Sequence, residues 1–412
     1  MNLVRTMRVL YVVGSCLTKN TSANMSHNAY VQGLLENGCQ VEILMADDSW
    51  GAQDNGLPTW EQAVYHYYPA TAVQDRLRKR LRGSTPAPAA GSAPAAGTEQ
   101  PRAAAVCRAR LRRFAKSMFY RCFPTDPVYP LEKTWLKKAA AFQSDTIYDL
   151  VVSNSSPAAS HKLVGRLLER GRLQCRRWVQ IWEDPWFFDL YGGHTDDIRR
   201  EEHALLQQAG EIYYVSPLTL KYQQAHYPDC AHKMKHIPLP YLVFSTKTSG
   251  TPAEFSFGYF GDYYSHTRNL LPFYHALSRS GHPGYIYGDS DLVLKKTERI
   301  EVSGRVTLDV LDGVQAKAGV LVHLCNLHGG QIPGKIYHYS ATEKPILFIL
   351  DGTPAEQEIL RSYFSQFDRF YFCENNADSI LETILTMEQE HRTWSRLEDF
   401  SPREVVARLL TP

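Results

Sequence analysis

Two successive series of alternating apolar strands and helices are the feature that most constrains the fold of this chain. The first series opens with a strand over Arg8–Val13, a helix over Met25–Asn37 that Gly38 ends, and a strand over Val41–Met45. Parallel neighbours need a crossover of about a dozen or more residues, usually a helix, so this alternation predicts a doubly wound parallel sheet. The same pattern begins again in the second half, which predicts a second sheet.

The other predicted elements continue both series. In the first they are strands Leu150–Ser153, Trp178–Trp182, Ile212–Val215 and Lys235–Pro238 with a helix over Ser160–Arg170; in the second, strands Phe255–Tyr259, Gly284–Tyr287, Arg305–Thr307, Gly319–Leu324 and Pro345–Leu350 with helices over Arg268–Ser278, Ala377–His391 and Pro402–Leu410. A Ser/Thr/Gly/Pro-rich stretch, Tyr241–Pro252, is typical of a linker. No Gly-x-Gly-x-x-Gly follows the first strand, which argues against a dinucleotide-dependent dehydrogenase.

Composition excludes several partners. The formal net charge of the 412 residues is +2, so the chain has no overall attraction to nucleic acid. The eight cysteines form no Cys-x-x-Cys pair and no zinc-like spacing, which indicates reduced thiols in a cytoplasmic protein. The basic, apolar start of the chain is too short for a signal peptide, and no run reaches the roughly 18 apolar residues of a membrane span.

One segment departs from this neutral composition. Between positions 76 and 121 the chain carries twelve Lys or Arg residues against Glu99 alone, a local net charge of +11, around the low-complexity stretch Pro86–Gly97. Phe114, Phe119 and Tyr120 lie among the second group of cations. A basic segment with aromatic residues predicts docking on an anionic membrane surface. The alternative is a solvated helix with one basic face.

The unit from Asn326 to Leu347 is the strongest functional signal. After the apolar strand, Gly329 and Gly330 allow close approach of the backbone, Pro333 suits a first helical turn, and Lys335 adds a positive charge. A helix N-terminus with a lysine favours a phosphate, so the unit predicts a diphosphate site. Such a loop can also serve only to turn the chain.

This strand–loop–helix–strand unit resembles the donor-binding motif of GT-B glycosyltransferases, in particular the family 4-like group of bacterial capsule and O-antigen synthesis. The resemblance implies two Rossmann-like domains that face each other across a cleft: an acceptor domain over 1–245, a nucleotide-sugar domain over 253–395, and a helix over 396–412 that crosses back. It also implies metal-independent transfer of a sugar from a nucleotide diphosphate to a polysaccharide or lipid-linked oligosaccharide, in the cytoplasm or on the inner face of the plasma membrane. The implied donor-binding residues are Gly14, Ser15, Arg268, Asn269, Gly330, Gln331, Gly334, Lys335 and His338.

The family pattern contains two glutamates eight positions apart, and this chain has neither of them. Their places fall at Gly330 and His338, and Glu343 stands where a glycine is expected. His338 can still hydrogen-bond a ribose hydroxyl. The departure leaves open a catalytically inactive GT-B-like protein that binds a sugar nucleotide or glycan. A nucleotide-sugar epimerase is a weaker alternative, because its acidic residues are not recognisable.

The acceptor side is predicted from the end of a first-domain strand. Asp184 is the candidate general base, and Trp182, Trp186 and Asn154 are candidate acceptor-binding residues. The carboxyl ends of parallel strands are where open α/β sheets bind ligands. The alternatives are an Asp-Pro turn at Asp184 and a surface arginine at Arg268. The Asp289-Ser290-Asp291 turn matches a short metal-binding signature of another fold, and we predict no metal or cofactor there.

Overall fold

The structure, a computed structural model, describes residues 6–19, 21–47, 57–71, 126–190, 192, 194–242, 255–390, 392 and 394–411. The basic segment between positions 76 and 121 and the linker from 243 onward lie outside the described residues. Among the described helices, none has the length and apolar character that crossing a membrane requires.

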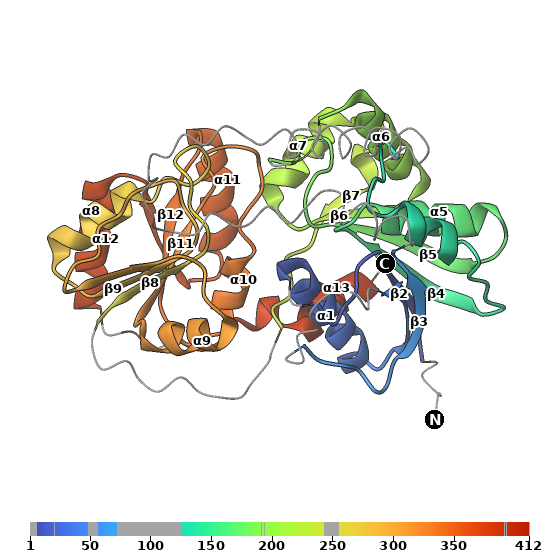
Figure 1. The fold of residues 1–412 in the computed structure, drawn as a ribbon, viewed down its shortest axis with the longest axis horizontal. Helices are drawn as coiled ribbons and strands as arrows, with labels where there is room; N and C mark the ends of the chain where they lie inside the picture. Colours follow the sequence, from blue (N-terminus) through green and yellow to red (C-terminus); the bar gives the residue numbers. More distant parts are fainter. Residues whose placement is uncertain are drawn as a thin grey trace, which may run out of the picture.

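The first sheet is parallel, with the strand order β3-β2-β1-β4-β5-β6-β7. Its strands are β1 (Arg8–Val13), β2 (Gln40–Asp47), β3 (Val64–Pro69), β4 (Ile147–Asn154), β5 (Gln174–Trp182), β6 (Glu211–Tyr214) and β7 (Met234–His236). Central strands are apolar on both faces because helices cover both; five of the six residues of β1 are buried. The sheet forms the right-hand lobe of Figure 1.

The second sheet repeats this winding in six parallel strands, in the order β10-β9-β8-β11-β12-β13. Its strands are β8 (Phe257–Phe260), β9 (Gly284–Tyr287), β10 (Ile300–Ser303), β11 (Val320–Leu324), β12 (Ile346–Leu350) and β13 (Phe370–Glu374). It forms the left-hand lobe of Figure 1. The predicted fold class, two Rossmann-like sheets, is therefore confirmed.

Helices connect the strands. They are α1 (Ser22–Glu36), α4 (Lys133–Ala139), α5 (Ala159–Glu169), α6 (Asp196–Gln208), α7 (Pro217–His226), η1 (Ala231–Lys233), α8 (Leu271–Ser280), α9 (Leu308–Lys317), α10 (Lys335–Ser340), α11 (Pro354–Ser365), α12 (Ala377–Gln389), η2 (Glu398–Phe400) and α13 (Pro402–Leu410). Side-chain caps set several of their starts: Thr21 accepts from the Asn24 N–H, and Thr353 and Glu356 form a capping box.

Several elements differ from the sequence-based predictions. The strand expected at Arg305–Thr307 lies earlier, at β10. Arg305 lies in the loop that follows β10 and forms an ion pair with Asp262. The outer strands β3 and β13 were not predicted: His66 interrupts the apolar residues of β3, whereas residues 370–373 of β13 are a short apolar run. The phosphate-loop helix α10 begins at Lys335, after Pro333, and has only six residues.

The chain passes between the two sheets at neighbouring points. The Tyr241 N–H, after β7, donates to the Phe400 carbonyl, just before α13, over 3.1 Å. From there α13 packs along α1 of the first lobe, and the two helices lie side by side in Figure 1. Phe400 itself is fully buried, with its ring 5.0 Å from that of Tyr337 on α10. The two crossing segments are thus joined by a hydrogen bond.

The α1–α13 contact depends on a glycine in the middle of α1. A Cβ on Gly33 would lie 2.1 Å from the Pro402 carbonyl oxygen and 2.5 Å from Val406. We expect Gly33→Ala to lower the free energy of unfolding by about 1–3 kcal/mol, the usual cost of overpacking, although alanine favours a helix. Gly313→Ala is the matched control, because open space surrounds this glycine of α9. It should stabilise the protein by about 0.5–1 kcal/mol in the same urea titration, and equal behaviour of both variants would contradict the close contact.

Candidate functional site

The strand orders place a candidate site without reference to any motif. In each sheet the winding direction reverses between the first strand and its later neighbour, at β1/β4 and at β8/β11. Ligands of open α/β sheets bind outside the carboxyl ends of the strands at such a switch point. The residues to consider therefore follow Val13 and Asn154 in one sheet and Phe260 and Leu324 in the other.

Positive charge gathers at the switch point of the second sheet. Lys335, the first residue of α10, lies over Gly261, where an added Cβ would be 3.7 Å from the lysine Cε. Burial lowers the pKa of Lys335, and the nearby charges of Arg305 and Arg268 lower it further against the opposing effect of Asp262. Arg268, which precedes α8, also hydrogen-bonds to the Tyr259 hydroxyl. A cluster of cations at this edge is suited to an anion such as a diphosphate.

Two histidines beside this cluster are neutral. Burial, and then the charge of Lys335, lowers the pKa of His338 to about 4. Burial, and then the charge of Arg268, lowers the pKa of His323 to about 3. A neutral imidazole both donates and accepts, which is compatible with the predicted contact of His338 with a ribose hydroxyl. The predicted residue Asn269 lies just before α8, and its side-chain oxygen accepts from the Leu271 N–H over 3.2 Å.

The glycine loop before α10 lies against the first lobe. Gly329 and Gly330 have φ of +98° and +73°, the left-handed region that favours glycine. The Gly330 carbonyl accepts hydrogen bonds from the Ser216 hydroxyl over 3.2 Å and from the Thr219 hydroxyl over 2.9 Å, at the start of α7. A Cβ on Gly330 would lie 2.6 Å from the ring of Tyr222. Contact between the lobes thus accounts for the second glycine.

Gln331, the next residue, connects the predicted base to this loop. Its amide nitrogen donates to the Asp184 carboxylate over 2.6 Å, and its amide oxygen accepts from the Leu190 N–H over 2.8 Å. Asp184 is exposed, but the surrounding protein displaces enough water to raise the pKa of its carboxyl group to about 6, while the bond from Gln331 opposes the rise. Asp184 and Gln331, predicted on opposite sides of a cleft, are in direct contact here.

The segment that carries Asp184 is held in place by a buried carboxylate on α6. Glu202 accepts from the backbone N–H groups of Trp186 and Phe187 over 3.0 and 2.9 Å, and from Gln223 and Tyr227 over 2.9 and 3.0 Å. Burial raises its pKa, and these hydrogen bonds oppose the rise. Sequence reasoning missed this residue, because its spacing on an amphipathic helix does not distinguish it from surface glutamates.

The two predicted acceptor tryptophans differ in environment. Trp182 is in the core: its indole N–H donates to Gln180 over 3.0 Å and its ring packs 4.3 Å from that of His161. These contacts account for Trp182 without a ligand, so we leave it out of the proposed acceptor site. Trp186 is partly exposed, with its ring 5.3 Å from that of Tyr129, and remains a candidate.

The remaining first-domain candidates lie at the β1/β4 switch point. The Gly14 N–H donates to the Ser160 hydroxyl over 2.9 Å, and a Cβ at Gly14 would meet Pro157 at 2.7 Å, so a close loop contact requires this glycine. The Ser15 hydroxyl donates to Asn24 over 2.7 Å. Contact of either residue with a donor phosphate stays a prediction.

Behind these loops lies a buried polar group that the sequence did not reveal. Asn154 donates to the Tyr11 hydroxyl over 2.8 Å, and Tyr11 lies 3.1 Å from His27 Nδ1. Glu183 Oε1 is 3.6 Å from the same nitrogen. Glu183 was visible only as the neighbour of Asp184, and nothing in the sequence pairs it with His27 of α1.

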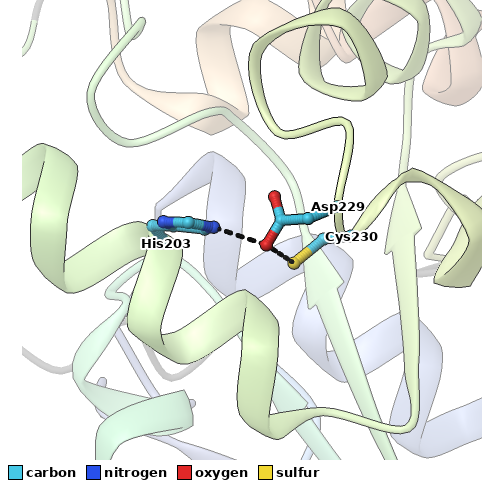
Figure 2. Close-up of side chains that lie close together, drawn as sticks. All are labelled: His203, Asp229 and Cys230. Atoms are coloured by element: carbon cyan, nitrogen blue, oxygen red, sulfur yellow. Dashed lines mark hydrogen bonds and ion pairs between the residues drawn. The ribbon is translucent and has the colours of Figure 1, made fainter.

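Two groups that include acidic side chains resemble metal ligands. Asp291 of the Asp289-Ser290-Asp291 turn accepts from the N–H and hydroxyl of Ser265, so hydrogen bonds within the protein explain this acidic side chain. Within the described ranges, one group of His, Cys and acidic side chains is close enough to hold an ion: His203, Asp229 and Cys230 (Figure 2). It lies at a surface hollow of about 440 Å³ beside α6 and α7. His203 Nε2 is 2.8 Å from the Asp229 carboxylate, an ordinary surface pair.

We predict that Glu202 sets the conformation of the Asp184 segment. Glu202→Gln would turn an amide N–H₂ toward groups that all donate, so we expect a loss of about 1–3 kcal/mol in the free energy of unfolding. Local hydrogen exchange over 183–190 should also increase. Glu382→Gln, at an exposed position of α12, is the control and should change neither. If the hydrogen exchange of residues 183–190 in Glu202→Gln equals that of the wild type, other contacts hold this segment.

Comparisons with known proteins agree at the level of the fold. No protein-family model matches this chain, and no curated protein sequence matches it significantly. A sucrose-phosphate synthase from Thermosynechococcus elongatus superposes with a TM-score of 0.56 at 12% identity, over 98% of this chain and 95% of that one. A UDP-GlcNAc 2-epimerase from Methanocaldococcus jannaschii (TM-score 0.48, 9% identity, 98% and 99% covered) and a glycosyltransferase from Rickettsia africae (0.47, 9%, 98% and 94%) also match. The first superposition and the two sheets confirm the predicted GT-B fold.

Proposed function

We propose that this protein is a glycosyltransferase that moves a sugar from a nucleotide diphosphate donor to a hydroxyl of a glycan or lipid-linked acceptor. The observation that carries the proposal is the position of Lys335 and Arg268 at the switch point of the second sheet. Carboxyl groups lie at the corresponding edge of the first sheet, and Gln331 joins the two edges. The superposed structure with a TM-score above 0.5, titled a sucrose-phosphate synthase, has the same fold, which agrees with the proposal.

The proposed donor site binds the diphosphate through charge. In glycosyl transfer the leaving nucleotide diphosphate gains negative charge, and fixed cations at its oxygens stabilise the transition state. Arg268 offers a planar guanidinium that binds two phosphate oxygens at once, and Lys335 offers a point charge. Because α10 has only six residues, we assign this stabilisation to the two side chains and give the helix end no separate role.

A second candidate, a sugar-nucleotide or glycan-binding protein without catalysis, is favoured by one observation. Gly330 and His338 occupy the positions where the related family carries glutamates, and the Gly330 carbonyl is bound to the first lobe by Ser216 and Thr219. A carboxylate is therefore missing from both positions. The carboxyl groups of Glu183 and Asp184 distinguish the candidates, because only an enzyme requires one of them for turnover.

The donor site is tested by removing its charges. A panel of nucleoside diphosphates and nucleotide sugars should contain at least one that raises the melting temperature, since a ligand that binds the folded state stabilises it. Arg268→Ala and Lys335→Ala should each weaken the binding of that nucleotide by about 1.5–3 kcal/mol in calorimetry, the range for hydrogen bonds to charged groups.

Lys296→Ala is the matched control for these two variants. Lys296 is exposed and precedes β10, so its loss removes the same charge elsewhere on the domain. The Lys296→Ala variant should bind the nucleotide with the same affinity as the wild type. Unchanged affinity in both Arg268→Ala and Lys335→Ala would place the nucleotide at another site.

A further inference from the structure

We propose that Glu183 is the acid–base residue of this site, that His27 faces its inner oxygen, and that the neighbouring Asp184 positions Gln331. The inference rests on the proposed glycosyl transfer and names the group that takes the acceptor proton. Three contacts carry it: Glu183 with His27, His27 with Tyr11, and Asp184 with Gln331.

The two oxygens of the Glu183 carboxyl group have different surroundings. Oε1 is fully enclosed, lies 3.6 Å from His27 Nδ1 and has no hydrogen-bond partner among the described residues. Oε2 is not among the enclosed atoms, and 10% of the side chain is exposed. A buried polar oxygen without a partner is costly and is usually explained by function or by bound solvent. The side chain thus links the interior to the surface at the carboxyl end of β5.

His27 is held in one protonation state by its partners. Its Nε2 lies 3.3 Å from the Ser156 carbonyl, which can only accept, so Nε2 carries the hydrogen. Nδ1 is therefore the acceptor for the Tyr11 hydroxyl, which in turn accepts from Asn154. Burial lowers the pKa of His27 to about 4, so the imidazole is neutral. Glu183 consequently faces a neutral ring and gains no full ion pair from it.

The charged state of Glu183 is disfavoured from every side. The titratable groups around it are His27 and Tyr30 of α1, Tyr11 of β1 and the adjacent Asp184. Burial, and then repulsion from Asp184, raises the pKa of Glu183 well above its ordinary value. No cation lies among these groups. A carboxylate with a raised pKa is a stronger base than an ordinary one, as general base catalysis at neutral pH requires.

Glu202, the other buried glutamate of this region, shows what a structural carboxylate looks like in the same domain. Both of its oxygens are hydrogen-bonded, to backbone and side-chain donors. Glu183 is slightly more exposed, and its inner oxygen has no such donor among the described residues. The absence of a structural partner for Glu183, within the described part of the chain, is the reason to give it a chemical role.

In the proposed step the acceptor hydroxyl loses its proton as the new glycosidic bond forms. The ionised Glu183 takes the proton of the acceptor O–H as that oxygen forms a bond to the anomeric carbon. The bond between this carbon and the donor's phosphate oxygen breaks, and the electron pair leaves with the nucleoside diphosphate. Glu183 then releases its proton to solvent through Oε2. Asp184 keeps the glycine loop in place through Gln331 and takes no proton.

The test compares two adjacent isosteric variants, Glu183→Gln and Asp184→Asn, with the donor nucleotide sugar and an acceptor extract. Glu183→Gln should keep donor affinity and lose about 10²–10⁴-fold in kcat, the usual worth of a general base. Asp184→Asn still accepts a bond from Gln331 and should lose only a few-fold in kcat, with a larger change in KM.

The pH profile separates the two carboxyl groups further. Asp184→Asn should shift the rising limb of kcat to lower pH, because it removes the charge that raises the pKa of Glu183. The residual kcat of Glu183→Gln should show no such rise with pH. A wild-type limb that ends near pH 6, the pKa of Asp184, and disappears in Asp184→Asn would overturn the assignment.

A second measurement needs no substrate. Because the folded state favours protonated Glu183, this side chain binds more protons in the folded protein than in the unfolded chain above about pH 4.5, and its contribution to stability should fall as pH rises. Glu183→Gln mimics the protonated form, so its denaturation midpoint should exceed that of the wild type increasingly from pH 5 to pH 8. A variant less stable than the wild type across this range would show an ion pair with His27 and overturn the inference.

Failure of the proposed glycosyl transfer can be distinguished from failure of the role proposed for Glu183. If no nucleotide sugar binds the wild-type protein, the donor site is wrong, and the acid–base role of Glu183 falls with it. If the wild type turns over and Glu183→Gln turns over equally, the donor site stands and only the present inference is overturned.

Discussion

The hydrogen bonds from Ser216 and Thr219 to the Gly330 carbonyl are the contact on which the arrangement of the site depends. They bring the loop before α10 against the start of α7, and only glycine permits the backbone conformation and the approach of Tyr222. With the loop in this position, Gln331 reaches Asp184 and Lys335 lies over Gly261. The same residues therefore join the two lobes and border the proposed donor site.

Neighbouring carboxyl groups at the end of β5 acquire different properties from their surroundings. Asp184 faces the other lobe and has a hydrogen-bond donor in Gln331. Glu183 directs one oxygen into its own domain toward the neutral His27, and part of its side chain is exposed. Environment separates the pKa values of two chemically similar groups, a common way for one site to hold both a positioning and a proton-transferring carboxyl group.

The fold was largely predictable from the sequence, whereas the site was predictable only in part. Buried central strands such as β1 and β12 are continuous apolar runs, and their period and length identify them. The edge strand β3 lacks this signal because its residues are partly exposed and His66 interrupts the apolar run, whereas β13 carries the signal over only four residues and was not predicted. The pairing of Glu183 with His27 joins residues 156 positions apart and depends on side-chain packing that no local pattern encodes. Asp184 could be predicted as a candidate because it lies two residues after the end of a strand.

The bond between the Tyr241 N–H and the Phe400 carbonyl has a mechanical consequence. A chain that passes once between two lobes is a tether, which permits separation and twisting in any direction. Phe400 is bonded to Tyr241 on one side and packs against Tyr337 of α10 on the other, so it forms a pivot that restrains separation and leaves rotation as the easier motion. The packing of α13 on α1 anchors one side of that pivot. Opening of the lobes at their sheet edges would then be a rotation that breaks the Gly330 and Gln331 contacts together, while the distance between the lobes at Phe400 stays constant.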